Sequence, residues 1–305
     1  SSPSRGLGDV YKRQFQSLAD ARDYVLSNDE DYFITDEIIR GVSFKVFKNG
    51  PKLIPDILNL CLNHKEKDFL VFDKERYSFG EFHQLTCQIA HLLMDEYSIR
   101  PGERVAILMK NSPEFPLIFM ALSSIGAVAV CLNSWWTSDE LKYGFMDSKV
   151  KLVFTDEQRL AKIKGFVSEM GVQTVLCRHQ NSDKSDEFWN SLLTSKNNEL
   201  PRTTIDQDSD FAVMYTSGST GHPKGVVMTH RGAISTLMSW HFGLRVLDVM
   251  GLGPVPYVDK NNQPYQPCQL VSVPFFHVSG THGGLLLALW SGTKLVIMKK
   301  WDPPE

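Results

Sequence analysis

Short apolar runs alternate with amphipathic segments from about residue 77 onward, and this alternation predicts a parallel sheet covered by helices. The compact apolar runs that predict strands lie at residues 104–109, 127–132, 150–155 and 172–177. Helical spacing or capping signals predict helices at about 78–97, 112–125, 137–146 and 156–170. The chain is therefore expected to form a doubly wound α/β fold, with largely parallel sheets and helices on both faces.

Several helix ends carry recognisable local signals. Two starts have the S/T-x-x-E capping box, formed by Ser78 with Glu81 and by Thr137 with Glu140. Ser112 and Pro113 predict the N-cap and first residue of a third helix. Gly171 is predicted to end the helix that begins near residue 156.

The chain also suggests how its domains are divided. Residues 1–14 show no apolar periodicity and no secretory h-region, so we set them aside as a non-native-looking leader. The polar stretch 179–207, rich in Ser, Asn, Asp and Lys, predicts a lobe boundary or a surface excursion. We expect a first α/β lobe over 15–200 and an incomplete second lobe over 201–305.

One uncharged stretch, residues 115–138, is long enough in principle to span a bilayer. Polar or small residues interrupt it at Ser123, Ser124, Gly126 and Asn133. A buried helix followed by a buried strand explains this stretch better, so no transmembrane segment is expected.

Composition and charge limit the partners. A formal net charge of -3 without long runs of one sign gives no electrostatic reason to expect nucleic acid. The five cysteines are widely spaced and form no CxxC pair, which favours a reducing, cytoplasmic setting. His83, Cys87 and His91 are spaced to lie on one helix face, either as zinc ligands or, as we favour, as an ordinary face with a buried cysteine. No fourth ligand can be named, and the ligands of any metal stay unknown.

The segment 215–230, YTSGSTGHPKGVVMTH, follows the apolar run 211–214 and is the main candidate for phosphate binding. Its glycines let backbone N–H groups point at one anion, and its hydroxyls add further donors. The candidate ligands of the phosphates are Thr216, Ser217, Gly218, Ser219, Thr220, Gly221 and Lys224. A Ser/Gly-rich loop can also be a plain hairpin connection. The spacing does not match the G-x-x-x-x-G-K-[ST] phosphate loop.

This sixteen-residue segment resembles the phosphate-loop signature of adenylate-forming enzymes, the superfamily of acyl-CoA synthetases, aryl-acid ligases, luciferases and peptide-synthetase adenylation domains. The resemblance extends over about residues 44–303. It implies the two lobes of that family's large N-terminal domain, with ATP, Mg²⁺ and CoA as cofactor and co-substrates. It also implies that Lys224 neutralises phosphate charge during catalysis.

A second family element is VPFFHVSG at 273–280. By resemblance, His277 lies beside the carboxylate and acyl group of the substrate. Amino-acid-activating domains tend to place Asp here, so a neutral His favours an acid without an α-amino group. Trp135 and Trp136 are interpreted as core and lobe packing. Of Phe275 and Phe276, at most one can line a pocket, because adjacent residues of a strand face opposite sides.

The implied function is ATP-dependent activation of a carboxylic acid, expected to be a fatty acid, through an acyl-adenylate and transfer to CoA. The family's acidic motif, ribose-binding Asp and C-terminal domain with the adenylation lysine would lie beyond residue 305. The chain by itself is therefore expected to be inactive. Two alternatives stay open: an aryl-acid ligase of the same family, and a nucleotide- or acyl-binding module without ligase activity. No function is assigned to residues 249–266.

Overall fold

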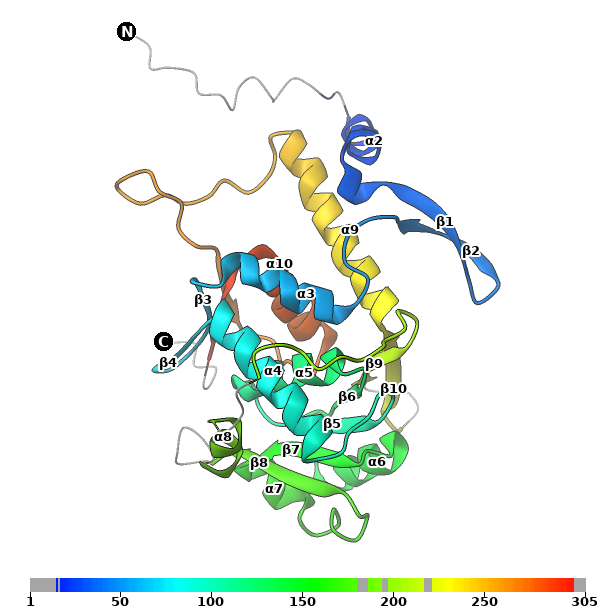
Figure 1. Cartoon of the computed structure of the whole chain (residues 1–305), viewed down its shortest axis with the longest axis vertical. Coiled ribbons are helices and arrows are strands. Elements are labelled where there is room, and N and C mark those ends of the chain that lie inside the picture. The colour runs from blue at the N-terminus through cyan, green and yellow to red at the C-terminus, as the bar shows by residue number, and fades with distance from the viewer. Residues whose placement is uncertain (1–14, 16, 180–185, 194–196, 217–220, 299–305) are drawn as a thin grey trace. The chain divides into compact units, whose positions relative to one another are not determined.

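The computed structural model describes residues 15, 17–179, 186–193, 197–216 and 221–298. Its contacts divide the chain into two compact units. One unit combines residues 1–52 with 232–265, and the other combines 53–231 with 266–305. Each unit is described below by itself, with the elements labelled as in Figure 1.

The first unit packs helices beside a two-stranded hairpin. Its elements are α2 (Leu18–Asn28), the 3-10 turn η1 (Glu30–Tyr32), β1 (Ile34–Ile39), β2 (Val42–Phe47) and most of α9 (His230–Val249). Ser17 caps α2 by accepting the N–H of Asp20 at 3.2 Å. Arg40 and Gly41 both have positive φ, which suits the tight turn between β1 and β2. Ala21, Val25 and Val246 form the buried core of this unit.

A six-stranded sheet organises the second unit, in the order β10-β9-β6-β5-β7-β8. Its strands are β5 (Arg104–Leu108), β6 (Val128–Cys131), β7 (Leu152–Asp156), β8 (Gln173–Arg178), β9 (Asp210–Thr216) and β10 (Lys224–Thr229). All neighbours are parallel except β9 and β10, which form an antiparallel hairpin at one edge. The central parallel strands β5, β6 and β7 are almost wholly buried, as expected of a sheet covered on both faces.

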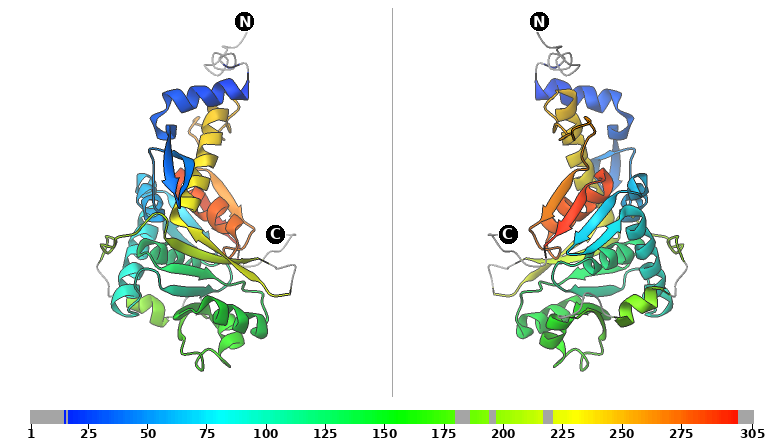
Figure 2. Two further views of the ribbon diagram at one scale, coloured as in Figure 1. Left: turned by 90° about the vertical axis from the view of Figure 1, so that its right-hand side faces the viewer. Right: turned by 90° about the vertical axis from the view of Figure 1, so that its left-hand side faces the viewer.

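Helices cover both faces of this sheet. They are α4 (Phe79–Asp95), α5 (Glu114–Ser124), α6 (Ser138–Ser148) and α7 (Glu157–Ile163). Figure 2 shows α4 and α5 along one face, with α6 and α7 along the other. On the α6/α7 face, Val130 and Val153 of the sheet share a buried cluster with Leu141, Phe145 and Ile163 of the helices. The predicted doubly wound α/β fold with largely parallel strands is confirmed.

A second sheet of four strands has the order β11-β12-β3-β4. Its strands are β3 (Asp68–Phe72), β4 (Glu75–Ser78), β11 (Cys268–Val271) and β12 (Lys294–Ile297). The remaining elements of this unit are α3 (Ile54–Leu60), η2 (Cys61–His64), α8 (Asp186–Leu193), the π-helix η3 (Ser279–Leu286) and α10 (Leu287–Ser291). Both sheets include strands from before and after residue 200. The expected division into lobes 15–200 and 201–305 stays a prediction, and it does not coincide with the division of the sheets.

A buried ion-pair network joins the edge strands of the two sheets. Arg178 of β8 donates to Glu114 at the start of α5, with a shortest distance of 2.7 Å, and to Glu75 of β4 at 2.9 Å. The Trp189 indole N–H also donates to Glu114, at 3.3 Å. The Glu114 side chain is fully buried and that of Arg178 is 6% exposed, so each charge depends on the other for solvation.

Local sequence signals located most elements well. Both predicted capping boxes form, and residues 115–138 fold as a buried helix followed by a buried strand. Within the described residues, no helix is long and apolar enough to cross a membrane.

Two helix predictions need correction, and one helix was not predicted. α7 ends at Ile163 rather than near residue 170, because Gly165 follows closely and glycine weakens helix interiors. The polar stretch 179–207 contains α8, whose Phe188 and Leu192 are buried at helical spacing. α5 begins at Glu114 with Pro113 as its cap residue, one residue later than predicted. The Ser112 hydroxyl instead points to the Met109 sulfur at 3.6 Å.

Candidate functional site

Three connecting segments of the six-stranded sheet lie together at the carboxyl ends of its strands. β9, β6 and β5 are parallel neighbours, so the segments that follow them lie side by side at their carboxyl ends. Asn111 follows β5, Trp135 follows β6 and Thr216 is the last residue of β9. Ligands of open α/β sheets bind at this carboxyl edge, so we place the candidate site here.

The ends of the predicted phosphate loop are well defined. Thr216 and Lys224 face each other across the β9–β10 hairpin, and the Thr216 hydroxyl donates to the Lys224 carbonyl oxygen at 3.4 Å. Both side chains are exposed, and Gly221 has a φ of +106°, in the region that favours glycine. An exposed ammonium group and an exposed hydroxyl beside a glycine with positive φ are groups that can bind an anion. Ser217, Gly218, Ser219 and Thr220 lie outside the described residues.

Helix α6 contacts the chain on both sides of this loop. The Tyr215 hydroxyl donates to Asp147 at 2.6 Å, and the His222 ring stacks on Tyr143 with centroids 4.7 Å apart. Tyr143 and Asp147 are four residues apart and so lie on one face of α6. Burial, followed by the effect of Asp147, raises the pKa of Tyr215 and keeps its hydroxyl a donor. α6 therefore fixes the residue before the loop and a residue after it.

The double variant Tyr143→Ala/Asp147→Ala is expected to bind inorganic tripolyphosphate about tenfold more weakly than the parent chain, because two contacts worth about 1 kcal/mol or less each are lost. Titration calorimetry on the 305-residue chain measures this. Met146→Ala, which changes an exposed neighbour on α6, is the matched control and should bind as the parent does. Equal affinity of the double variant and the parent would show that α6 does not set the loop.

The His277 side chain is exposed in a turn just before η3. Its Nδ1 accepts the N–H of Ser279 at 3.3 Å and lies 3.1 Å from the Ser279 hydroxyl. Because Nδ1 is an acceptor, the neutral ring carries its proton on Nε2. The exposed Nε2–H group can donate to a carboxylate.

The aromatic residues around His277 divide between core and surface. Phe275 is fully buried and stacks on Phe115 at 5.6 Å, whereas Phe276 meets Trp135 edge-on at 5.3 Å. Phe275 therefore belongs to the core and Phe276 to the surface. Both lie in a turn after β11 rather than in the strand assumed from the sequence. Trp136 is buried against Tyr215, in agreement with a packing role.

The packing interpretation of Trp135 is wrong, because 70% of its surface is exposed. The difference arises in the turn after β6, where the Asn133 side chain accepts the Trp135 N–H at 2.9 Å. The sequence of two adjacent aromatic residues does not indicate which one is buried and which one is exposed.

The residues that directly follow the His277 motif in η3 pack on β9, the strand that leads into the predicted phosphate loop. The Thr281 hydroxyl lies 3.9 Å from the Met214 sulfur, and the ring of His282 lies 5.9 Å from that of Phe211. Met214 and Phe211 belong to β9, which ends at Thr216. The structure thus places the start of η3, which directly follows the second motif, against the strand that ends in the first motif.

The three residues considered as zinc ligands do not converge. Cys87 Sγ lies 3.7 Å from His83 Nδ1, but the His91 ring instead contacts the Glu199 carbonyl oxygen at 3.2 Å. Burial raises the pKa of Cys87 to about 12, which disfavours the thiolate that binds metals. Across the described ranges, no group of three or more His, Cys, Asp or Glu side chains is placed to hold a metal ion.

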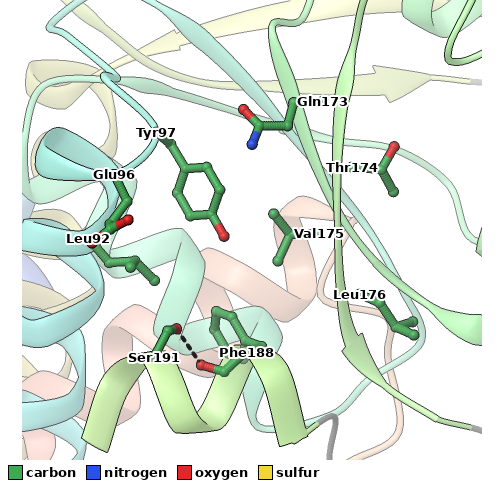
Figure 3. Close-up of a pocket in the computed structure, with 9 residues that line it drawn as sticks. All are labelled: Leu92, Glu96, Tyr97, Gln173, Thr174, Val175, Leu176, Phe188 and Ser191. Carbon is green, nitrogen blue, oxygen red and sulfur yellow. Dashed lines mark hydrogen bonds between the residues drawn. The ribbon is translucent and has the colours of Figure 1, made fainter. Parts of the chain in front are cut away.

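A cavity of about 320 Å³ lies elsewhere in the second unit (Figure 3). It is lined from the end of α4, from β8 and from α8, by Leu92, Glu96, Tyr97, Gln173, Thr174, Val175, Leu176, Phe188 and Ser191. β8 is the sheet edge opposite β10, and none of the predicted site residues lines the cavity. The cavity is therefore separate from the candidate site.

Comparison with known proteins gives consistent results. 4-Coumarate–CoA ligase CCL1 of Humulus lupulus is 33% identical over 211 residues, covering 68% of this chain and 36% of that protein. 4-Coumarate–CoA ligase 2 of Petroselinum crispum is 27% identical over 228 residues, covering 75% of this chain and 39% of that protein. The chain thus spans well under half the length of these relatives.

Solved structures show the same fold. The inhibitor-bound N-terminal domain of FACL13 from Mycobacterium tuberculosis has a TM-score of 0.68 at 25% identity, covering 83% of this chain and 58% of that chain. The anthranilate CoA ligase AuaEII, solved with anthranoyl-AMP, shares the fold with a TM-score of 0.67 at 19% identity, over 82% of this chain and 44% of that chain. The sequence pattern of the family described as AMP-binding enzyme matches residues 60–305, and the chain therefore belongs to that family.

Proposed function

We propose that the protein activates a carboxylic acid with ATP, through an acyl-adenylate, and transfers the acyl group to CoA. The observation that carries this proposal is the packing of Thr281 and His282, which follow His277 closely in the chain, on β9, the strand that leads into the predicted phosphate loop. A hydrogen-bond donor for a carboxylate and a phosphate loop, both close to one strand, suit a reaction that joins an acid to a nucleotide. Membership of the AMP-binding enzyme family supports the same chemistry.

In the first step, a carboxylate oxygen attacks the α-phosphorus of ATP, and the bond from that phosphorus to pyrophosphate breaks. In the second, the sulfur of CoA attacks the acyl carbon, and AMP leaves with the electrons of the broken C–O bond. Two anions must meet in the first step, so charge neutralisation is the main catalytic requirement. When bound, Mg²⁺ would supply part of that neutralisation.

We assign two residues distinct roles in this reaction. Lys224 is exposed beside the loop, and its ammonium group offsets the charge that builds on the departing pyrophosphate. His277 donates from Nε2 to the carboxylate of the acid and orients it for attack. Thr216, Gly221 and the loop between them hold the phosphates.

We further propose that the acid lacks an α-amino group, because His277 provides no negative charge for a substrate ammonium. One of the similar solved structures is named a fatty acyl CoA synthetase, whereas other matched proteins are named 4-coumarate–CoA ligase and anthranilate CoA ligase. A fatty acid, our expectation from sequence, therefore has to be compared directly with 4-coumarate and anthranilate as substrates.

The deciding experiment is acid-dependent exchange of pyrophosphate into ATP, measured on a protein extended to the length of its relatives. Lys224→Ala is expected to lower kcat about a hundredfold, as for other losses of a charge-stabilising donor. His277→Ala is expected to raise KM for the acid about tenfold, with KM for ATP little changed.

Lys260→Ala, an exposed lysine of the other unit, is the matched control and should leave both constants unchanged. The absence of exchange with every acid tested would overturn the ligase function and leave a binding module. Intact exchange in Lys224→Ala would overturn the role of that lysine.

A further inference from the structure

The side chain of Asn111 binds the backbone of the His277 segment at two points. Its Nδ2 donates to the Val273 carbonyl oxygen at 2.8 Å, and its Oδ1 accepts the N–H of Phe275 at 2.9 Å. One amide thus satisfies both a carbonyl and an N–H group of a segment that leaves β11 and no longer has a strand partner. The two hydrogen bonds join residues more than 160 positions apart in the sequence.

The position of Asn111 is itself fixed by its neighbours. It lies between the end of β5 and the start of α5. The N–H of the preceding Lys110 donates to the buried Asp156 at 3.1 Å, and Asp156 also caps α7. The contacts of Asn111 therefore fix the position of residues 273–275 relative to the parallel sheet.

The turn that follows is tightly folded and transmits this placement. The N–H of His277 donates to the Pro274 carbonyl oxygen at 3.2 Å, and the N–H of Gly280 donates to the His277 carbonyl oxygen at 2.9 Å. A Cβ atom at Gly280 would lie 2.2 Å from the Pro274 carbonyl oxygen, so only glycine fits there. Because the turn from Pro274 to Gly280 is compact, the direction of His277 depends on how residues 273–275 are held.

We propose that Asn111 is a positioning residue for the acid site, which holds residues 273–275 so that His277 presents Nε2–H at the carboxyl edge of the sheet. This inference rests on the proposed role of His277 in binding the acid. Phe275 stays anchored by its ring on Phe115 when Asn111 is replaced. Loss of the amide is therefore expected to loosen and redirect the turn without unfolding the unit.

Two variants separate the two hydrogen bonds. Asn111→Leu loses both bonds, whereas Asn111→Asp keeps an acceptor for the Phe275 N–H but replaces the donor to Val273 with a second acceptor. Asn49→Leu is the matched control, because Asn49 also donates to a backbone carbonyl, that of Glu30 at 2.7 Å, but in the other unit.

The first measurement is amide hydrogen exchange and the NMR signals of the His277 ring in the 305-residue chain. In Asn111→Leu, exchange of the Phe275 N–H is expected to be about tenfold faster, and the ring signals of His277 are expected to shift. Asn111→Asp should keep most of the protection, and Asn49→Leu should resemble the parent at both positions. Unchanged Phe275 exchange and unchanged His277 signals in Asn111→Leu would overturn the proposal.

The second measurement is pyrophosphate exchange on the extended protein. Asn111→Leu is expected to raise KM for the acid about tenfold while KM for ATP stays constant, with a smaller effect for Asn111→Asp. If the parent protein turns over acids and Asn111→Leu has the same KM for the acid, the positioning role is overturned but the proposed function is not. If the parent shows no acid dependence, the proposed function fails, and the exchange and ring signals alone decide whether Asn111 positions His277.

Discussion

Replacing Arg178 by methionine is expected to lower the free energy of unfolding by about 3–5 kcal/mol, because it leaves a buried carboxylate without its partner. Glu114 is fully buried and receives three bonds of 2.7–3.1 Å from the guanidinium group. Glu75 would also lose its bonds to Arg178, although Tyr77 would still donate to it at 2.7 Å. Methionine keeps most of the side-chain volume, so the change reports the charge rather than a cavity.

Urea denaturation of the parent and variant chains measures this effect. Lys151→Ala breaks the exposed pair with Glu103, at 3.0 Å, and is expected to cost under about 1 kcal/mol. The double variant Arg178→Met/Glu114→Met removes both buried charges and should recover much of the lost stability. If Arg178→Met were no less stable than Lys151→Ala, the network would not be what fastens the two sheets.

The elements predicted correctly from sequence are those whose signals are local. Ser78 with Glu81 lies within a single helical turn, and the central strands read as continuous apolar runs because both faces of the sheet are covered. α8 was overlooked because polar residues surround its two buried apolar side chains. The pairing of strands from before residue 200 with strands from after it depends on contacts between distant segments, which local sequence patterns do not reveal.

The candidate site shows the same limit. Lys224 and His277 could be predicted as candidates because each lies within a contiguous motif. Asn111 and Asp147 could not be predicted, because each acts through a partner far away in the sequence. Asn111 contacts Val273, 162 residues away, and Asp147 contacts Tyr215, 68 residues away. Asn111 follows a buried strand and precedes a helix, which is the only sequence signal that could have singled it out.

Two buried histidines are expected to make the fold lose stability in mild acid. The rings of His230 and His282 both lie close to the ring of Phe211, with centroids 5.3 and 5.9 Å from it. Burial lowers the pKa of each from its ordinary value of 6.5 to about 4. His230 Nδ1 also accepts the N–H of Ile54 at 3.2 Å, a bond that a proton on Nδ1 would break.

The sign follows from which state binds more protons. Between pH 6.5 and 4 the unfolded chain takes up protons at these histidines while the folded chain does not, so stability is complete above about pH 6.5 and falls as the pH decreases. The protonation equilibrium of each histidine is expected to lower the free energy of unfolding by about 2 kcal/mol between pH 7.5 and pH 5.

In urea titrations at these two pH values, His282→Gln should reduce the loss seen in the parent chain by about that amount. His179→Gln, at a side chain that is 46% exposed, is the matched control and should keep the pH dependence of the parent. A parent chain equally stable at both pH values, or a His282→Gln variant with the parent's pH dependence, would contradict the assignment of neutral, buried imidazoles at this place.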